Sequence, residues 1–260
     1  MSPDRLRRPV GPFLALALLA APAGAVAQTL SLSPAVVPLS GRFGQSTRQT
    51  LALTNGTPLD LAFELEAKDV VVRDGQRVFV EAGEVAGSIA ATAVFSARRV
   101  SVPPGAAASV DVTLTLPAAA AHRAVVVLFR GVTPIRDGRG ASTTASLGTL
   151  LTFSLSDDCS VAAEELAVRP QTASSILGFE QAFANDGREP VVLKGVTVVL
   201  DAGGSIVGKA PFRPHRLLPG ERASLRADHA GELPPGRYRA LATFDFEGRA
   251  VTRAADFEVP

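Results

Sequence analysis

A phrase that occurs twice is the strongest constraint on the fold of this chain. Residues 98–129 read RRVSVPPGAAASVDVTLTLPAAAAHRAVVVLF, and residues 216–246 read RLLPGERASLRADHAGELPPGRYRALATFDF. Each copy has a strand, a Pro-Gly turn, a second strand, a break, and a third strand that ends on an aromatic residue. Each copy also follows a strand that ends in a turn, in LALTNGTP (51–58) and in FEQAFANDGREP (179–190). A duplicated all-β unit indicates binding or scaffolding more than catalysis.

The chain begins with the three parts of a secretory signal peptide. Arg5, Arg7 and Arg8 are basic, residues 13–23 form a short apolar run, and Ala25-Val26-Ala27 supplies small residues for cleavage. The run is too short to cross about 30 Å of hydrocarbon, so we expect cleavage and no stable membrane insertion. We therefore expect a periplasmic protein, with the extracellular surface as the alternative location.

Charge and cysteine content exclude several classes of partner. The net charge is +1, and removal of the signal peptide, with three arginines and one aspartate, leaves about −1. No basic stripe or polybasic run indicates nucleic acid or an anionic membrane surface. Cys159 is the only cysteine, so no intrachain disulfide can form and core packing must hold the exported protein together. We interpret Cys159 as incidental, with a reactive thiol or an intermolecular link as alternatives.

Alternating apolar and polar residues predict strands along the chain. Residues 110–116 place Val and Leu on one face and Asp and Thr on the other, which is typical of a strand with one face in a core. Residues 122–129 are almost continuously apolar and predict a central strand buried on both faces. Asn55-Gly56 is a strong turn signal. Residues 81–93 are the one candidate helix of the first unit, weakened by two glycines.

The two copies differ in length. Asn55 and Gly105 are 50 residues apart, whereas Asn185 and Gly220 are 35 apart. The first unit therefore carries an extra segment, mainly residues 68–92, which we expect to be a hairpin or loop extension of the fold.

Strand number and spacing predict the architecture. About seven short strands per hundred residues, with turns every 8–12 residues, indicate β-sandwiches of immunoglobulin type, although the Cys and Trp core of antibody domains is absent. The polar residues 157–160 follow a complete set of strands. We predict an all-β chain with a signal peptide (1–27) and two tandem immunoglobulin-like β-sandwich domains (28–156 and 161–260).

Patterns for catalysis or metal binding are weak. His122, His215 and His229 are the only histidines, and none has the spacing of HExxH or of a ligand pair. No GxSxG elbow is present, while a Ser-His-Asp triad assembled by the fold stays open. The paired carboxylates at 157–158 and 164–165 are interpreted as solvated. We expect that the protein is not an enzyme and binds no metal or cofactor. A hydrolase of unknown type is a third hypothesis, behind two hypotheses of partner binding.

Hydrogen bonding of the backbone to a partner is therefore the leading candidate for how this protein functions. Edge strands leave N–H and C=O groups unpaired, and an extended partner can add to them as a further strand. Residues 145–155 are the best candidate, because their apolar and polar residues alternate. The apolar face carries Ala145, Leu147, Leu151, Phe153 and Leu155, and the other face carries Ser146, Gly148, Thr152 and Ser154. The alternative is an ordinary last strand whose apolar face is turned into its own core.

Two stretches of the first unit combine these features in a recognisable order. FSARRVSVPPGAAASVDVTLTLP (95–117) reads as strand, Pro-Gly turn and strand, and LFRGVTPIRDGRGASTTASLGTLLTFSL (128–155) reads as strand, Pro-containing loop and last strand. In this order, with two sandwiches behind a signal peptide, they resemble periplasmic pilus-assembly chaperones. In that family the last strand of the first domain lends alternating apolar residues to an incomplete pilin subunit. The resemblance implies the donor residues Leu147, Leu151, Phe153 and Leu155.

The chain departs from that family at one functional feature. The family holds the subunit's terminal carboxylate with an Arg in the first strand and a Lys in the last. Here SLSPAVVPLS (31–40) contains neither residue, and Leu150 aligns with the Lys. The repeated phrase also resembles, more weakly, two-domain WxL-interacting surface proteins of Gram-positive bacteria. That family usually ends in a membrane helix, and none appears before Pro260.

Both resemblances imply an exported, non-enzymatic binding protein. The first hypothesis is a chaperone-like protein that binds an extended segment of another exported protein, a pilin-like subunit or a surface protein, by strand addition. The alternative is a structural or adhesive cell-surface module that binds a surface protein or glycan through loops, with residues 68–92 as the favoured contact.

Overall fold

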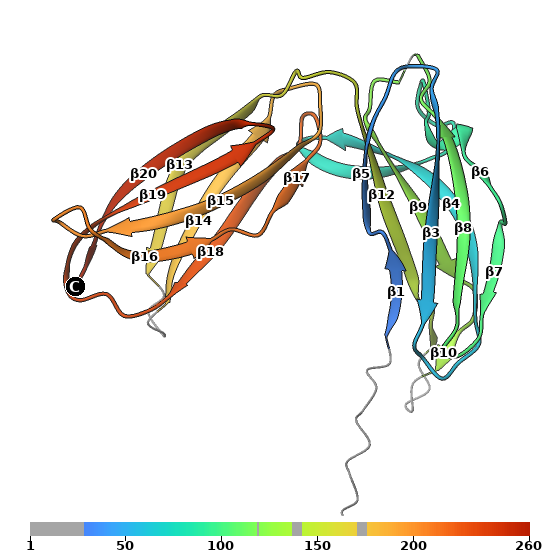
Figure 1. Ribbon diagram of the computed structural model, residues 1–260, viewed down its shortest axis with the longest axis horizontal. Coiled ribbons are helices and arrows are strands. Elements are labelled where there is room, and N and C mark those ends of the chain that lie inside the picture. The colour runs from blue at the N-terminus through green and yellow to red at the C-terminus, as the bar shows by residue number, and fades with distance from the viewer. Residues whose placement is uncertain (1–28, 119, 137–141, 171–175) are drawn as a thin grey trace, which may run out of the picture.

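Two β-sandwiches, joined by a short linker, make up the described part of the chain (Figure 1). The computed structural model describes residues 29–118, 120–136, 142–170 and 176–260. The prediction of an all-β chain with two immunoglobulin-like sandwiches is confirmed, while the predicted signal peptide lies outside these residues. Within them, no helix has the length and apolar character needed to span a membrane.

The first sandwich packs a four-stranded sheet against a six-stranded sheet. The four-stranded sheet has the order β1 (Leu30–Ser33), β3 (Ser46–Asn55), β8 (Ala107–Thr115) and β6 (Val94–Phe95). The other has the order β2 (Val36–Ser40), β12 (Ser146–Ser154), β9 (Ala124–Gly131), β4 (Leu61–Arg73) and β5 (Gln76–Glu81), with β7 (Arg99–Val102) also paired to β4. A separate ribbon pairs β10 (Ile135–Arg136) with β11 (Ser142–Thr143).

The second sandwich is built from eight strands. One sheet has the order β13 (Val161–Pro170), β14 (Ile176–Asn185) and β18 (Arg222–Ala230). The other has the order β16 (Ile206–Pro211), β15 (Val191–Leu200), β19 (Gly236–Phe246) and β20 (Arg249–Val259), with β17 (His215–Leu217) also paired to β15. Its core includes an edge-to-face pair, Phe183 and Phe244, whose ring centroids lie 4.6 Å apart. Such pairs add to the stabilisation from area burial.

The strands predicted from apolar patterning lie where expected. In β8, Val110, Val112 and Leu114 are buried and alternate with half-buried polar residues. In β9, residues 124–127 are all buried, because this strand lies between β12 and β4 and both of its faces are covered. One face packs in the main core, and the other packs in a smaller cluster with Leu218 of the second sandwich.

A buried asparagine ties three chain segments of the first sandwich together. The Asn55 Nδ2 group donates to the carbonyl oxygens of Leu59, at 2.7 Å, and Val102, at 2.8 Å. The backbone carbonyl of Asn55 accepts from Gly105 of the Pro-Gly turn at 2.7 Å. The turn predicted at Asn55-Gly56 carries the chain from β3 to β4, which lie in different sheets, and the Thr57 amide donates to Asn55 Oδ1 there at 3.0 Å.

The second sandwich repeats this arrangement with Asn185. Its Nδ2 group donates to the carbonyl oxygens of Glu189, at 2.9 Å, and Leu217, at 3.1 Å. The Asn185 carbonyl accepts from Gly220 at 2.8 Å. Gly105 and Gly220 both have positive φ angles, +71° and +77°, which glycine adopts without strain. The phrase repeated in the sequence is therefore the framework around one buried carboxamide per sandwich.

The extra segment of the first copy is a hairpin followed by a loop. β4 and β5 form the hairpin, as expected. The helix expected at 81–93 was wrong: only Ala90–Thr92 forms one turn of 3₁₀ helix, η1. Gly83 and Gly87 have φ angles of +86° and +65°, which are incompatible with a right-handed helix.

We predict that Asn185→Asp destabilises the protein by about 2–3 kcal/mol. The carboxylate cannot donate, so two buried carbonyl groups lose their partners and a charge is buried. Urea unfolding followed by circular dichroism measures the change. The control is Asp186→Ala, an exposed neighbour without a side-chain hydrogen bond among the described residues, which should stay within about 0.5 kcal/mol of wild type. Equal effects of the two substitutions would contradict the framework role.

Candidate functional site

Strand β12 has a neighbour along most of its length on one side and along about half of it on the other. β9 pairs antiparallel with Ser146–Thr152, whereas β2 pairs parallel with Leu150–Ser154. No described strand pairs with Ser146–Thr149 on the β2 side. We call the backbone of Ser146–Thr149 on that side the open half-edge.

Hydrogen-bond directions show which groups the open half-edge offers. The Leu150 N–H donates to Ala35 on the β2 side at 3.0 Å, and the Phe153 N–H donates to Arg123 on the β9 side at 2.8 Å. Successive residues of a strand direct their backbone groups to opposite sides. Ser146 and Gly148 therefore direct their N–H and C=O groups away from β9, where an added strand could bond them.

The half-edge ends where the chain crosses from β1 to β2. The Thr149 hydroxyl donates to the carbonyl oxygen of Pro34 at 2.8 Å, next to the bond between Leu150 and Ala35. Beyond this crossing β2 occupies the side of β12. A partner strand can thus add along about four residues before it meets β2.

The outer face of β12 beside the half-edge is flat and apolar. A Cβ atom at Gly148 would lie 2.8 Å from Leu128 Cδ2 and 3.0 Å from Val126 Cγ2, so these side chains fill the space above the glycine. Leu150 is half-buried in the same cluster, and Val36, paired with it, is 44% exposed. The surface at the end of the half-edge therefore favours uncharged, apolar groups.

The four residues predicted as donors face the core of their own sandwich in this structure. Leu151 and Phe153 are buried in the main core, and Leu147 and Leu155 are half-buried against it. Leu147 lies at the open half-edge, Leu151 and Phe153 lie where β2 already pairs, and Leu155 follows the strand. Their role in partner binding stays a prediction.

A cavity of about 760 Å³ lies where the two sandwiches meet, beyond the end of β12. Its walls include Leu39, Ser40 and Leu155 from the first sandwich and Arg216 and Arg249 from the second. Burial lowers the pKa of Arg216, and no carboxylate of the described residues lies within ion-pair distance of its guanidinium. Sequence reasoning missed this cavity because its walls come from segments that lie far apart along the chain, such as those of Leu39 and Arg216.

Cys159 also contributes to this cavity and is itself buried. Burial raises the pKa of its thiol, which disfavours the thiolate needed for reactivity. The backbone carbonyl of Cys159 accepts a hydrogen bond from the Arg249 guanidinium. The residue thus packs the start of the second sandwich.

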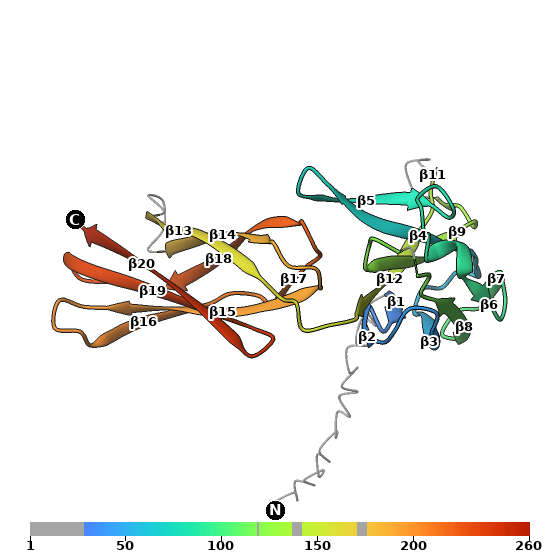
Figure 2. The same cartoon turned by 90° about the horizontal axis from the view of Figure 1, so that it is seen from above.

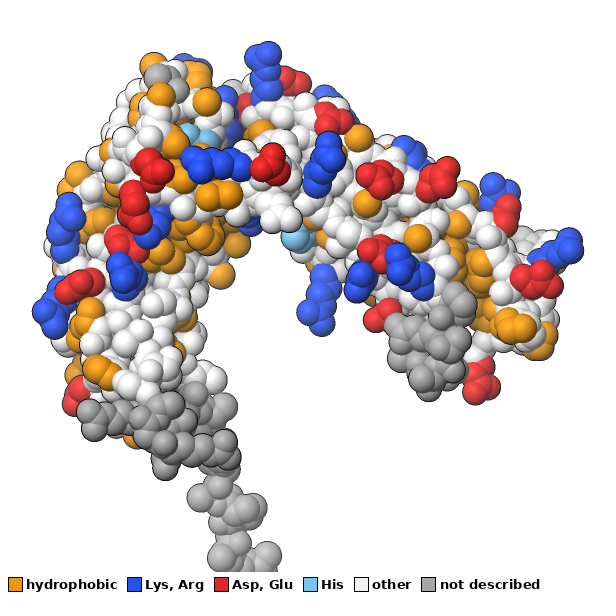
Figure 3. All heavy atoms as spheres, turned by 180° about the vertical axis from the view of Figure 1, so that it is seen from behind, with side chains coloured by type: hydrophobic (Ala, Val, Ile, Leu, Met, Phe, Trp, Pro, Cys, Tyr) orange, Lys and Arg blue, Asp and Glu red, His pale blue; other side chains and the backbone are white. Residues whose placement is uncertain are grey.

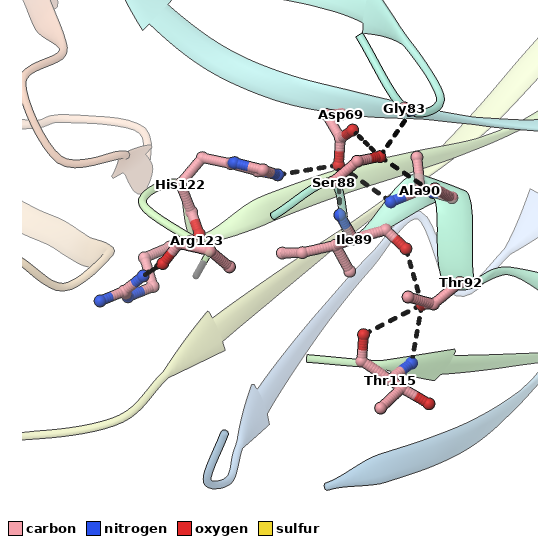
Figure 4. Close-up of polar contacts among 11 residues, drawn as sticks. Asp69, Gly83, Ser88, Ile89, Ala90, Thr92, Thr115, His122 and Arg123 are labelled. Atoms are coloured by element: carbon pink, nitrogen blue, oxygen red, sulfur yellow. Dashed lines mark hydrogen bonds and ion pairs between the residues drawn. The ribbon is translucent and has the colours of Figure 1, made fainter. Parts of the chain in front are cut away.

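Asp69, a buried carboxylate, is the centre of a second polar cluster (Figure 4). It accepts hydrogen bonds from the Ser88 hydroxyl at 2.5 Å and from the Ile89 and Ala90 amides at 2.9 Å. His122 Nε2 lies 2.8 Å from the same carboxylate. These contacts fasten the loop after β5 onto β4.

Asp69, Ser88 and His122 are the residue types of a catalytic triad, but their hydrogen bonds do not run from serine to histidine to aspartate. Both Ser88 and His122 bond to Asp69, so the imidazole is not placed to accept the serine proton. Within the described residues no group of three possible metal ligands is found. The geometry supports a structural role for this cluster.

Burial alone would raise the pKa of Asp69, but the hydrogen bonds outweigh it. His122, Ser88 and the Ala90 amide all favour the charged form, and the net pKa lies below its ordinary value. A carboxylate with a lowered folded pKa stabilises the fold above its unfolded pKa of about 3.9, and this contribution is lost as pH falls through the folded pKa.

Comparison with known proteins identifies similarity in structure only. No family model matches the chain, and no curated protein matches it. The E. coli chaperone DraB is 13% identical with a TM-score of 0.41, covering 89% of this chain and 98% of its own. A chain of the Salmonella enterica SafA pilin–SafB chaperone complex is 14% identical with a TM-score of 0.43, covering 88% and 96%. A chain of the Acinetobacter baumannii CsuC–CsuE chaperone–tip subunit complex is 8% identical with a TM-score of 0.42, covering 88% and 97%. These three likenesses concern the fold alone.

We predict that Asp69→Asn destabilises the protein most at pH 5 and above. The difference from wild type should shrink as pH falls from about 4 through the folded pKa of Asp69, because the carboxylate is protonated first in the unfolded state and only then in both states. Urea unfolding at a series of pH values measures it. Asp74→Asn, at an exposed carboxylate in the turn of the same hairpin, is the control, and its effect on stability should stay within about 0.5 kcal/mol. A difference that stays constant from pH 7 to pH 3 would contradict the assignment.

Proposed function

We propose that this protein is an exported, non-enzymatic, chaperone-like protein that binds an extended segment of another exported protein by β-strand addition. The observation that carries this proposal is the open half-edge, where Ser146 and Gly148 direct backbone groups away from β9. The partner class is a pilin-like subunit or a surface protein. We place the protein in the periplasm, with a signal peptide at residues 1–27, as part of the same proposal.

The surroundings of the half-edge support this mode of binding. Half-buried Leu30 and Leu32 of β1 and Leu147 of β12 lie at the side of the first sandwich where strand β12 lacks a neighbour. A partner strand that bonds to the half-edge would cover these side chains, and burial of apolar area stabilises such a complex. Backbone bonds supply affinity, and alternate side chains of the partner supply specificity.

Strands β2 and β12 lie on the side of the first sandwich that faces the second (Figures 1 and 2). Figure 3 shows the two sandwiches from behind, with acidic and basic side chains interspersed on the visible face. Neither sign of charge dominates there, so electrostatic steering by a large single-sign surface is not expected from that face. Recognition then depends on backbone pairing and on apolar contact beside Leu150 and Val36.

Core burial of Leu151 and Phe153 changes how strand addition must be tested. A charged substitution at either position would place a carboxylate in the main core and unfold the sandwich, whatever the partner does. A test at the half-edge must therefore alter the backbone donor and leave the core side chains in place.

We predict that Ser146→Pro weakens partner capture about tenfold, because proline removes one backbone donor of the half-edge and leaves the bonds to β9 intact. The matched control, Ser146→Ala, keeps the N–H and should bind like wild type. A photo-crosslinking residue at position 144, carried by each variant in the native host, reports capture after mass spectrometry. Equal crosslinking of one exported protein by both variants would rule out strand addition at this edge.

A second candidate is the adhesive module that contacts a partner through residues 68–92. It is favoured by one observation: Phe79 on β5 is 58% exposed on the side of the hairpin. For this function, Phe79→Ser should abolish capture while Ser146→Pro leaves it unchanged. The opposite pattern supports strand addition, so one pair of variants distinguishes the two functions.

A further inference from the structure

The β4–β5 hairpin extends beyond the sandwich that it belongs to. β9 pairs with β4 only as far as Val70, whereas β5 pairs with β4 as far as Arg73. We call the projecting part, residues 71–78, the strap. Figure 2 shows it reaching from the first sandwich toward the second, and Figure 1 shows its tip near β17.

The tip of the strap makes a backbone hydrogen bond to the second sandwich. The amide of Arg222 donates to the carbonyl oxygen of Gly75 at 2.8 Å. Gly75 has a φ angle of +78°, and a Cβ atom there would lie 3.1 Å from Arg222 Cγ. Glycine at this position therefore permits both the turn and the close approach.

An ion pair beside the tip adds a charged contact. Arg77 Nε donates to Glu221 Oε1 at 2.8 Å, and the Arg77 guanidinium also donates to the carbonyl oxygen of Arg216. The Glu221 side chain is only 9% exposed. Its second oxygen accepts from the Leu218 amide at 2.7 Å, so the carboxylate is fully engaged. Removal of Arg77 would leave this carboxylate without its charge partner, which is costly for a group so little exposed.

A second attachment lies at the linker between the sandwiches. Glu189 of the second sandwich, 2% exposed, accepts from the Leu155 amide at 3.0 Å and the Ser156 hydroxyl at 2.9 Å. Arg123 lies 3.9 Å from the same carboxylate. A single attachment would leave rotation about the linker free, whereas two separate attachments fix the angle between the sandwiches.

We propose that the strap is a detachable latch that sets the angle between the two sandwiches. It projects past the main cores of both sandwiches, and Val72 packs in the small cluster with Leu218. Its release therefore breaks this apolar contact and the contacts of Gly75 and Arg77, and leaves each main core intact. The linker with Glu189 then acts as the hinge. The cavity has walls from both sandwiches, so its width depends on the latch. This inference does not rest on the proposed binding function.

The variant Arg77→Ala tests the latch, with Arg73→Ala as the matched control. Arg73 is an exposed arginine on the same hairpin, without a side-chain hydrogen bond or ion pair to another described residue. Spin labels at Ser101 and Asp228, in a Cys159→Ser background, report the distance between the sandwiches by pulsed electron spin resonance. We expect a broader distance distribution for Arg77→Ala and none of this broadening for Arg73→Ala.

Hydrogen exchange at one amide gives an independent measurement. The Arg222 amide bonds across the interface, so its exchange should accelerate about tenfold or more in Arg77→Ala, as expected for loss of a hydrogen bond to a charged group. Amides within β9 and β19 should keep their protection, which distinguishes release of the latch from unfolding. If Arg77→Ala does not fold, Arg77→Gln replaces it. Unchanged distances and unchanged exchange in the folded variant, or an unprotected Arg222 amide in the wild-type protein, would overturn the proposal.

Discussion

One buried carboxamide per sandwich holds the turns on which the rest of this structure depends. Asn55 and Asn185 are both inaccessible to solvent, and the side chain of each donates to two backbone carbonyl groups. Carbonyl groups left unbonded at such depth would cost more than a hydrogen bond gains, so the asparagine cannot be exchanged for an apolar residue of similar size. The same sequence pattern occurs in both halves of this chain because each half must provide hydrogen-bond partners for the same buried backbone carbonyl groups.

The second copy of this framework also carries the joint between the sandwiches. The carbonyl oxygen of Glu189 accepts from the Asn185 side chain, as that of Leu59 accepts from the Asn55 side chain. The carbonyl oxygen of Glu221 accepts from the Asn185 amide, as that of Ala106 accepts from the Asn55 amide. In the second copy these two positions hold carboxylates, and both face the first sandwich. The rigid framework thus presents two anchoring groups at fixed positions. The Arg77 guanidinium of the strap donates to Glu221, and the Leu155 amide and Ser156 hydroxyl of the linker donate to Glu189.

Local patterns in the sequence predicted the elements but not their pairing. Alternation identified β8 and β12, and a continuous apolar run identified β9, because side-chain periodicity depends only on neighbouring residues. β2 escaped prediction because its five residues include Pro38 and its partner lies more than a hundred residues away. The half-length pairing of β12 follows from where β2 begins, which no local pattern encodes. The expected helix failed because the glycines there serve turns with positive φ.

Three other sheet edges of the molecule are protected, unlike the open half-edge. β2 carries Pro38, which cannot donate to a further strand. At the edge of β16, His229 Nδ1 lies 3.3 Å from the Lys209 carbonyl oxygen. Between β13 and β20, the Arg253 guanidinium donates to the carbonyl oxygen of Ala163 at 2.9 Å. Unprotected edges invite aggregation, and natural sheets cover them with prolines, charges and side-chain contacts of this kind. The chain covers these three edges but leaves the backbone groups of Ser146 and Gly148 open beside apolar Leu150, as the proposed strand addition requires.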